Sequence, residues 1–228
     1  MADNYLESRY EEVFGSGARK SVIKRTNPSL NTLLVKNRTI RRFRQDIDIN
    51  AEQLHTIVNV NSSLASAMNR QLLRFRPVDS SDIDKVNALR QILFREPARE
   101  ESARAFIIVY SILPEERYID IDLGISLQSM ALKAVELGLN CLIKGNLDRD
   151  ALRAFFKEDD EHILAENGYE VLEPVAVLCV GKSAESVFLK PVNAGEDLTP
   201  YTKEGVHYVP KLQSETLILK LLLSAKTF

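Results

Sequence analysis

The spacing of hydrophobic and polar positions predicts a chain that mixes helices with strands. Apolar, β-branched runs fill residues 105–113 and 171–181, which is typical of strands buried in a core. Residues 73–78 alternate between apolar and basic side chains, which favours a strand with one buried face. The short run NCLIKG at 140–145 predicts a further strand. An α/β or α+β domain is the fold class that follows.

Helical periodicity or a capping signal marks much of the remaining chain. The predicted helices cover residues 3–14, 28–35, 51–58, 81–94 and 149–156. Asn27 with Pro28 supplies a cap and a favoured first residue for the second helix. Asn50 with Gln53 resembles a capping box for the third, and Asp148 is expected to cap the last.

Residues 117–139 have a helical composition, yet their apolar side chains cover most of the helix circumference. These side chains are Ile121, Leu123, Ile125, Leu127, Met130, Leu132, Val135 and Leu137. A helix that is apolar nearly all round is buried on most sides. We therefore expect either a central helix or a helix that packs against another subunit.

The C-terminal part of the chain shows a weaker pattern. We expect residues 183–213 to be irregular and residues 215–223 to form a final short apolar helix or strand. There is no internal repeat, low-complexity segment or linker between two parts of the sequence. A single domain over residues 1–228 is therefore expected, with an N-terminal helical extension at 1–30 and a C-terminal extension at 183–228.

Composition and charge narrow the classes of function. The 228 residues include 30 basic and 32 acidic side chains, so the chain as a whole has no field that would recruit nucleic acid. Cys141 and Cys179 lie in apolar runs and are expected to be reduced and buried. The acidic start lacks the apolar core of a signal peptide, and no apolar stretch nears the ~20 residues that span a bilayer. We expect a cytoplasmic protein without a membrane partner.

Several kinds of catalytic site lack their sequence motifs. The histidines His55, His162 and His207 stand far apart and CxxC is absent, so no metal site is expected. The sequence has no G-x-S-x-G elbow of a serine hydrolase. It also lacks the glycine-rich motifs of Rossmann and P-loop nucleotide sites.

Residues 36–44 (KNRTIRRFR) form a basic run that leaves three interpretations open. A charged, solvated face near a helix end is one of them. An anion site is the second, because guanidinium groups bind phosphate oxygens with two parallel hydrogen bonds and the threonine hydroxyl adds a donor. Nucleic-acid binding is the third, although it requires a wider basic surface or interleaved aromatic residues.

Two further segments carry candidate binding groups. Residues 63–71 (SLASAMNRQ) are consistent with a plain loop, but their amide side chains can also pair with a heterocycle such as the edge of an isoalloxazine. Lys144-Gly145-Asn146 is consistent with a strand-ending turn. It also matches a site where glycine allows the backbone to approach a planar ligand.

The order and spacing of these segments resemble those of the FMN-dependent nitroreductase family. The likeness covers roughly residues 30–220 and lies in five blocks. They are RTIRRF at 38–43, SAMNRQ at 66–71, LGISLQSMALKAVELGLNCLIKG at 123–145, EPVAVLCVGKSAE at 173–185 and HYVPKLQSETLI at 207–218. The resemblance implies an α+β, three-layer α/β/α fold with a central, mostly antiparallel sheet, a long buried interface helix and an intertwined homodimer.

The resemblance also implies roles for residues in the first and last blocks. Arg38 and Thr39 would contact the FMN phosphate and ribityl chain. Arg41 would approach the pyrimidine edge of the flavin, where positive charge stabilises the reduced ring. Lys211 would complete the phosphate site.

The middle blocks would supply the remaining contacts to the flavin. Ser66, Asn69 and Gln71 would reach it from the other subunit, so the homodimer would be required for binding. Lys144 and Gly145 would place backbone N–H groups near the flavin N5. No side chain need act as a nucleophile.

The sequence departs from the family pattern in both phosphate-binding blocks and in the loop. Asn37 stands where the family has an arginine, and Leu212-Gln213 follow Lys211 without the usual nearby arginine. Ala65 replaces the loop proline, and Leu72-Leu73 replace a Pro-Trp pair. The phosphate site is thus expected to have lost two cations.

The implied activity is a ping-pong oxidoreduction in which NAD(P)H reduces FMN and a small-molecule electron acceptor reoxidises it. The acceptors of this family are nitroaromatics, quinones and similar electron-poor compounds. The alternative is a protein of the same fold that binds flavin or another small molecule without turning over NAD(P)H, and the lost arginines motivate it.

Overall fold

The computed structural model describes residues 28–219 except residue 115, so the helix expected at 3–14 lies outside the described residues. The helices are α2 (Leu30–Lys36), α3 (Ala51–Val58), α4 (Ile83–Leu93), α5 (Arg117–Glu136), α6 (Arg149–Phe155), α7 (Lys157–Asn167) and α8 (Ser214–Leu217). The strands are β1 (Leu73–Val78), β2 (Ala105–Ser111), β3 (Asn140–Lys144), β4 (Glu173–Gly181), β5 (Ser186–Val192), β6 (Tyr201–Lys203) and β7 (Val206–Leu212). No helix in the described part is long and apolar enough to cross a membrane.

The central sheet contains the four strands that the hydrophobic pattern predicts. Its order is β1-β2-β4-β3, and every neighbouring pair is antiparallel. All seven residues of β2 are buried, and so are all residues of β4 except Glu173. Continuous apolar runs become the two inner strands because both of their faces are covered.

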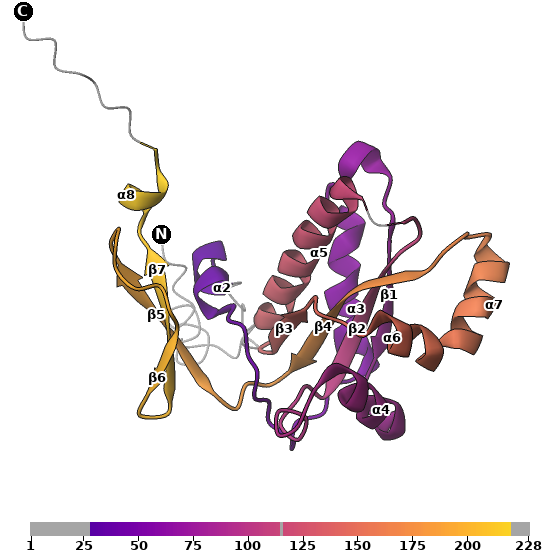
Figure 1. Ribbon diagram of the computed structural model, residues 1–228, viewed down its shortest axis with the longest axis horizontal. Coiled ribbons are helices and arrows are strands. Elements are labelled where there is room, and N and C mark those ends of the chain that lie inside the picture. Colours follow the sequence, from indigo (N-terminus) through magenta and orange to yellow (C-terminus); the bar gives the residue numbers. More distant parts are fainter. Residues whose placement is uncertain (1–27, 115, 220–228) are drawn as a thin grey trace, which may run out of the picture.

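Helices cover both faces of this sheet and produce three layers (Figure 1). On one face, Leu54 and Ile57 of α3 and Met130 of α5 pack against Ile107 of β2. The other face packs against α4 and α6, with α7 alongside. The expected α/β/α layering and antiparallel sheet are confirmed.

The long helix α5 is buried along one side in the single chain. Met130 and Ala134 are almost fully covered by the sheet and α3. By contrast, Tyr118 is 52% exposed, Ile121 47% and Ile125 39%. The apolar circumference seen in the sequence therefore divides into a covered side and an apolar side that the described residues leave open.

The helix caps follow the sequence signals with one correction. Asn50 and Gln53 form the expected capping box, and Asp148 accepts a hydrogen bond from the third residue of its helix. The cap predicted at Asn27 is wrong, because α2 begins at Leu30 and the Ser29 hydroxyl accepts from the backbone N–H of the third helical residue. Serine stands next to the helix and meets the unpaired first-turn donors directly.

The prediction that residues 183–213 are irregular is wrong. They form a second sheet of order β5-β7-β6, in which β5 pairs parallel and β6 antiparallel to β7 (Figure 1). Pro191, Pro210 and several polar side chains interrupt the apolar runs by which strands are recognised. The alternating exposure along β5 shows that this sheet has one open face.

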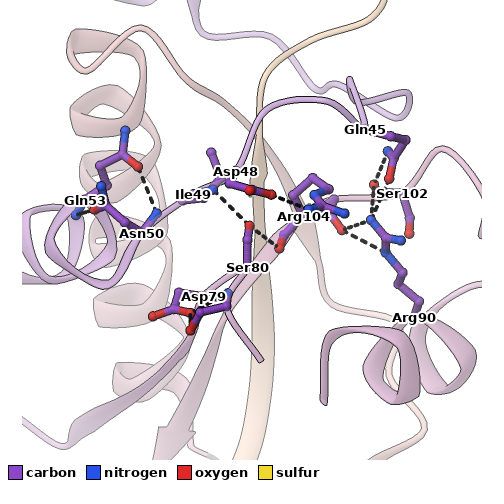
Figure 2. A network of polar contacts seen from close by, with 12 residues as sticks. Gln45, Asp48, Ile49, Asn50, Gln53, Asp79, Ser80, Arg90, Ser102 and Arg104 are labelled. Carbon is purple, nitrogen blue, oxygen red and sulfur yellow. Dashed lines mark hydrogen bonds and ion pairs between the residues drawn. The ribbon is translucent and has the colours of Figure 1, made fainter. Parts of the chain in front are cut away.

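A polar network holds the segment after the basic run against the end of the central sheet (Figure 2). The Ser80 hydroxyl accepts from the backbone of Ile49 at 2.9 Å and donates to the carbonyl of Arg104 at 3.0 Å. Arg90 donates to the Gln45 side chain at 2.7 Å and to nearby carbonyls. These contacts fix where the basic run enters the fold.

Candidate functional site

The basic run lies beside the edge strand β3. Thr39 forms an isolated parallel bridge with Cys141, and the N–H of Ile40 donates to the Cys141 carbonyl at 3.1 Å. Ile40 and Phe43 are buried, which anchors the run to the core. The intervening basic residues are therefore directed to the surface of the protein.

Residues from six parts of the chain line a cavity of about 310 Å³, hereafter the basic cavity. Arg38, Thr39 and Arg41 come from the basic run, and Lys211 comes from β7. Other lining residues are Asn37, Gln128, Ala131, Cys141, Ile143, Val187, Pro200, His207 and Val209. The structure thus brings together four of the nine residues that the sequence analysis assigned to the site.

The lining of the basic cavity has one sign of charge. Among the described residues that line it, three side chains are cations and none is an aspartate or glutamate. Burial raises the pKa of the Cys141 thiol, which keeps this part of the lining neutral. The nearby Glu185 carboxylate accepts from the backbone N–H of Arg41 and does not line the cavity. A cavity lined by cations favours an anionic ligand.

Arg38 is the lining residue whose hydrogen bonding most clearly favours an anionic ligand. Its guanidinium donates to the carbonyl of Leu34, but its Nε is buried and has no hydrogen-bond partner among the described residues. Burial lowers the pKa of this guanidinium below its ordinary value. A phosphate or carboxylate oxygen would satisfy the donor and compensate the charge.

The other arginines of the run are neutralised by neighbouring carboxylates. Arg42 donates to Glu101 at 2.5 and 2.9 Å, and Arg44 donates to Asp46 at 3.0 Å. These hydrogen bonds raise the pKa of both guanidinium groups. The run is therefore divided between paired surface arginines and the cations of the basic cavity.

The loop at 66–71 lies elsewhere, at a smaller cavity of about 230 Å³ that Ser66 and Gln71 line. The Gln71 amide donates to Asn69 at 3.1 Å, and the Gln71 N–H donates to the Ser66 hydroxyl at 3.2 Å. Met68, Asn69 and Gln71 all have positive φ. Such conformations are strained for residues other than glycine and persist only where the surroundings impose them.

Helix α5 supplies the contacts that impose this loop conformation. The Ala67 N–H donates to both carboxylate oxygens of the buried Asp122, at 3.0 and 3.2 Å. Arg70 pairs with Glu116 at 2.7 Å. Met68, between these anchors, is 76% exposed. The loop is thus tied to the first half of α5, the helix that also carries the open apolar side chains.

Lys144 and Gly145 end the strand that borders the basic cavity. Ile143 lines this cavity, whereas the Lys144 side chain lines a separate cavity of about 1080 Å³ and stands 5.5 Å from the centre of the Phe94 ring. A Cβ atom at Gly145 would meet no heavy atom within 4 Å. There is consequently open space for a ligand beside this backbone.

Three polar residues of the basic cavity, Asn37, Gln128 and His207, were not among the predicted site residues. Gln128 lies on α5 and accepts from the Asn37 amide at 3.5 Å. His207 lies on β7, four residues before Lys211. A polar residue within a mostly apolar helix was a usable signal for Gln128. No pattern marked His207, because its strand was not recognised.

Comparisons with known proteins show which fold this arrangement belongs to. No protein-family model matches the sequence, and no curated protein matches it. A protein of Bacteroides thetaiotaomicron described as a NADH dehydrogenase or NAD(P)H nitroreductase has a similar structure, with a TM-score of 0.51, 18% identity and coverage of 71% of this chain and 90% of that one. A nitroreductase family protein of Clostridium novyi gives a TM-score of 0.54 at 16% identity, covering 68% and 86%.

A third similar structure contains the cofactor. It is a protein of Desulfovibrio desulfuricans described as a nitroreductase in complex with FMN, with a TM-score of 0.52, 19% identity and coverage of 70% of this chain and 89% of that one. The described part of the chain therefore has the nitroreductase-like fold that the five sequence blocks predict.

Proposed function

We propose that this nitroreductase-like protein is an FMN-dependent NAD(P)H oxidoreductase that reduces nitroaromatics, quinones or similar electron-poor acceptors. When bound, FMN would supply the redox chemistry of a ping-pong cycle, with NAD(P)H as the reductant and the electron-poor compound as the acceptor. The protein's own contribution is to bind, orient and electrostatically tune the cofactor.

The basic cavity is the observation that carries the proposal. Among the described residues, the buried Arg38 Nε has no hydrogen-bond partner, and Arg38, Arg41 and Lys211 line one cavity to which no described carboxylate contributes. This donor set suits a phosphate group. In our assignment Arg38, Thr39 and Lys211 bind the phosphate and ribityl chain, and Arg41 stabilises negative charge at the pyrimidine edge.

We further propose that the cofactor site is completed in a homodimer. Ser66, Asn69 and Gln71 are not among the residues that line the basic cavity. Their loop is fixed to α5, whose side chains Tyr118 and Ile121 are open. Burying this apolar side against a second copy would stabilise the pair and allow each loop to reach the other chain's flavin.

The end of β3 would position the reactive part of the ring. In our assignment the backbone N–H groups of Lys144 and Gly145 would lie near the flavin N5, and a Cβ at Gly145 would meet none of the described residues within 4 Å.

The first experiment is the visible absorption of the purified protein before and after incubation with FMN and gel filtration. We expect flavin bands to co-elute with a dimer and to bleach under anaerobic NADH or NADPH, then to recover when a quinone or nitroaromatic is added. Stable flavin bands without bleaching would favour the binding protein without NAD(P)H turnover. A dimer that elutes colourless after FMN incubation would contradict the proposal.

A further inference from the structure

Strand β7 presents alternate side chains to the basic cavity. His207, Val209 and Lys211 line it, as expected for residues two apart on one face of a strand. Tyr208 is directed to the opposite face, where its ring stacks on Tyr201 with centroids 5.2 Å apart. The imidazole of His207 therefore belongs to the same enclosed surface as the cations of the cavity.

One nitrogen of this imidazole already has a partner. Thr202 on β6 stands opposite His207 in the strand register, and its hydroxyl lies 3.2 Å from His207 Nδ1. The hydroxyl can accept from a protonated Nδ1 or donate to an unprotonated one. When it donates, the proton sits on Nε2, and the Nε2–H is a hydrogen-bond donor even when the imidazole is neutral.

The charged groups around His207 make an anion its best partner. Arg38, Arg41 and Lys211 share the cavity with it, and no carboxylate lines that cavity. The rest of the lining near it is apolar or neutral, including Val187, which pairs with His207 across β5 and β7. A donor in this field is complementary to a phosphate oxygen.

We propose that His207 is a phosphate-binding residue of the FMN site, with Thr202 holding its imidazole in the donor tautomer. This inference rests on the proposed function. His207 would give the cavity a second donor from β7 in addition to Lys211. The arginine that the family usually has near this lysine is absent, because Leu212 and Gln213 follow it. His207 discriminates FMN from riboflavin, which has the same ring and ribityl chain but no phosphate.

The test compares the dissociation constants of FMN and riboflavin, measured by flavin fluorescence titration on the full-length protein. His207→Ala should weaken FMN binding about tenfold, the equivalent of one charge-assisted hydrogen bond, and leave riboflavin binding within about twofold. Thr202→Val keeps the imidazole but removes its partner and should weaken FMN about threefold. Thr202→Ser should bind as the wild type does.

Two controls separate a local effect from a loss of fold. His55→Ala changes an exposed histidine on α3 and should alter neither constant. Far-UV circular dichroism of every variant checks the fold, and Thr202→Val carries the test if His207→Ala does not fold.

The outcomes distinguish this inference from the proposed function. Unchanged FMN binding in His207→Ala, or equal losses for FMN and riboflavin, would overturn the phosphate role while leaving the flavoprotein intact. A wild-type protein that binds neither flavin would overturn both.

Discussion

The two sheets of this protein differ in burial and in the charge that their strands carry, although edge strand β3 of the central sheet also lines the basic cavity. In the central sheet, β2 is buried along its whole length and carries no ionisable side chain except Tyr110. In the second sheet, β6 is exposed throughout and β7 carries His207 and Lys211. On a strand covered on both faces, a charged side chain would lose its hydration, which costs free energy. A sheet with an open face can carry charged side chains in contact with water.

The contrast extends to the aromatic residues of the two sheets. Phe106 of β2 is fully buried, whereas Phe188 of β5 is 57% exposed and stands 6.3 Å from Tyr208. Equal side chains in the two sheets therefore make different contributions to the free energy of unfolding. The difference gives a direct way to test which sheet holds the fold together.

The largest expected effect is that of Phe106→Ala. Removing a fully buried phenyl ring should lower the free energy of unfolding by about 3–5 kcal/mol, through lost burial and a cavity that only partly collapses. Phe188→Ala, the matched change in the second sheet, should cost less than about 1.5 kcal/mol. Urea unfolding of both variants measures the difference, and equal losses would refute the contrast between the sheets.

Gly181→Ala tests the junction between the sheets and should have the next largest effect. A Cβ atom here would lie 2.7 Å from Cδ1 of Phe43, whose ring is buried. Overpacking of this kind costs about 1–3 kcal/mol. Gly124→Ala is the control because its Cβ would meet nothing within 4 Å, and it should not be destabilised. Thermal unfolding measures the stability of both variants, and equal changes in their melting temperatures would contradict the prediction.

Arg38→Ala should have the smallest effect on stability and a clear effect on binding. Its guanidinium has a buried, unpartnered Nε, so its removal should leave the free energy of unfolding within about 0.5 kcal/mol of the wild type or raise it. The FMN dissociation constant should rise at least about tenfold. Arg44→Ala, outside the basic cavity, is the binding control. A destabilised Arg38→Ala with normal FMN affinity would show that Arg38 is structural.

The two inner strands of the central sheet could be predicted from the sequence because they bury both faces. The runs at 105–113 and 171–181 and the capping box at Asn50 and Gln53 correspond to observed elements. The second sheet could not be predicted in this way. Its strands pair with one another in a layer that is largely exposed. Residues 183–213 therefore do not need the continuous apolar run that marks a buried strand.

The residues of the candidate site could not be predicted from the spacing of hydrophobic and polar positions alone. Arg38 and Lys211 are more than 170 positions apart in the sequence, and the resemblance to a family, rather than any local pattern, predicted that both would belong to one site. The structure brings these two residues into one cavity. The place of His207 in this cavity could not be predicted, because a single histidine in an unrecognised strand has no local sequence pattern.

The bridge between Thr39 and Cys141 has a consequence for solubility. Strand β3 is an edge of the central sheet, and an uncovered edge offers its backbone groups to strands of other molecules. The segment that carries Arg38 and Arg41 also shields this edge, and the N–H of Ile40 occupies a carbonyl there. Loss of this pairing would therefore expose the backbone of β3 and favour self-association of the protein.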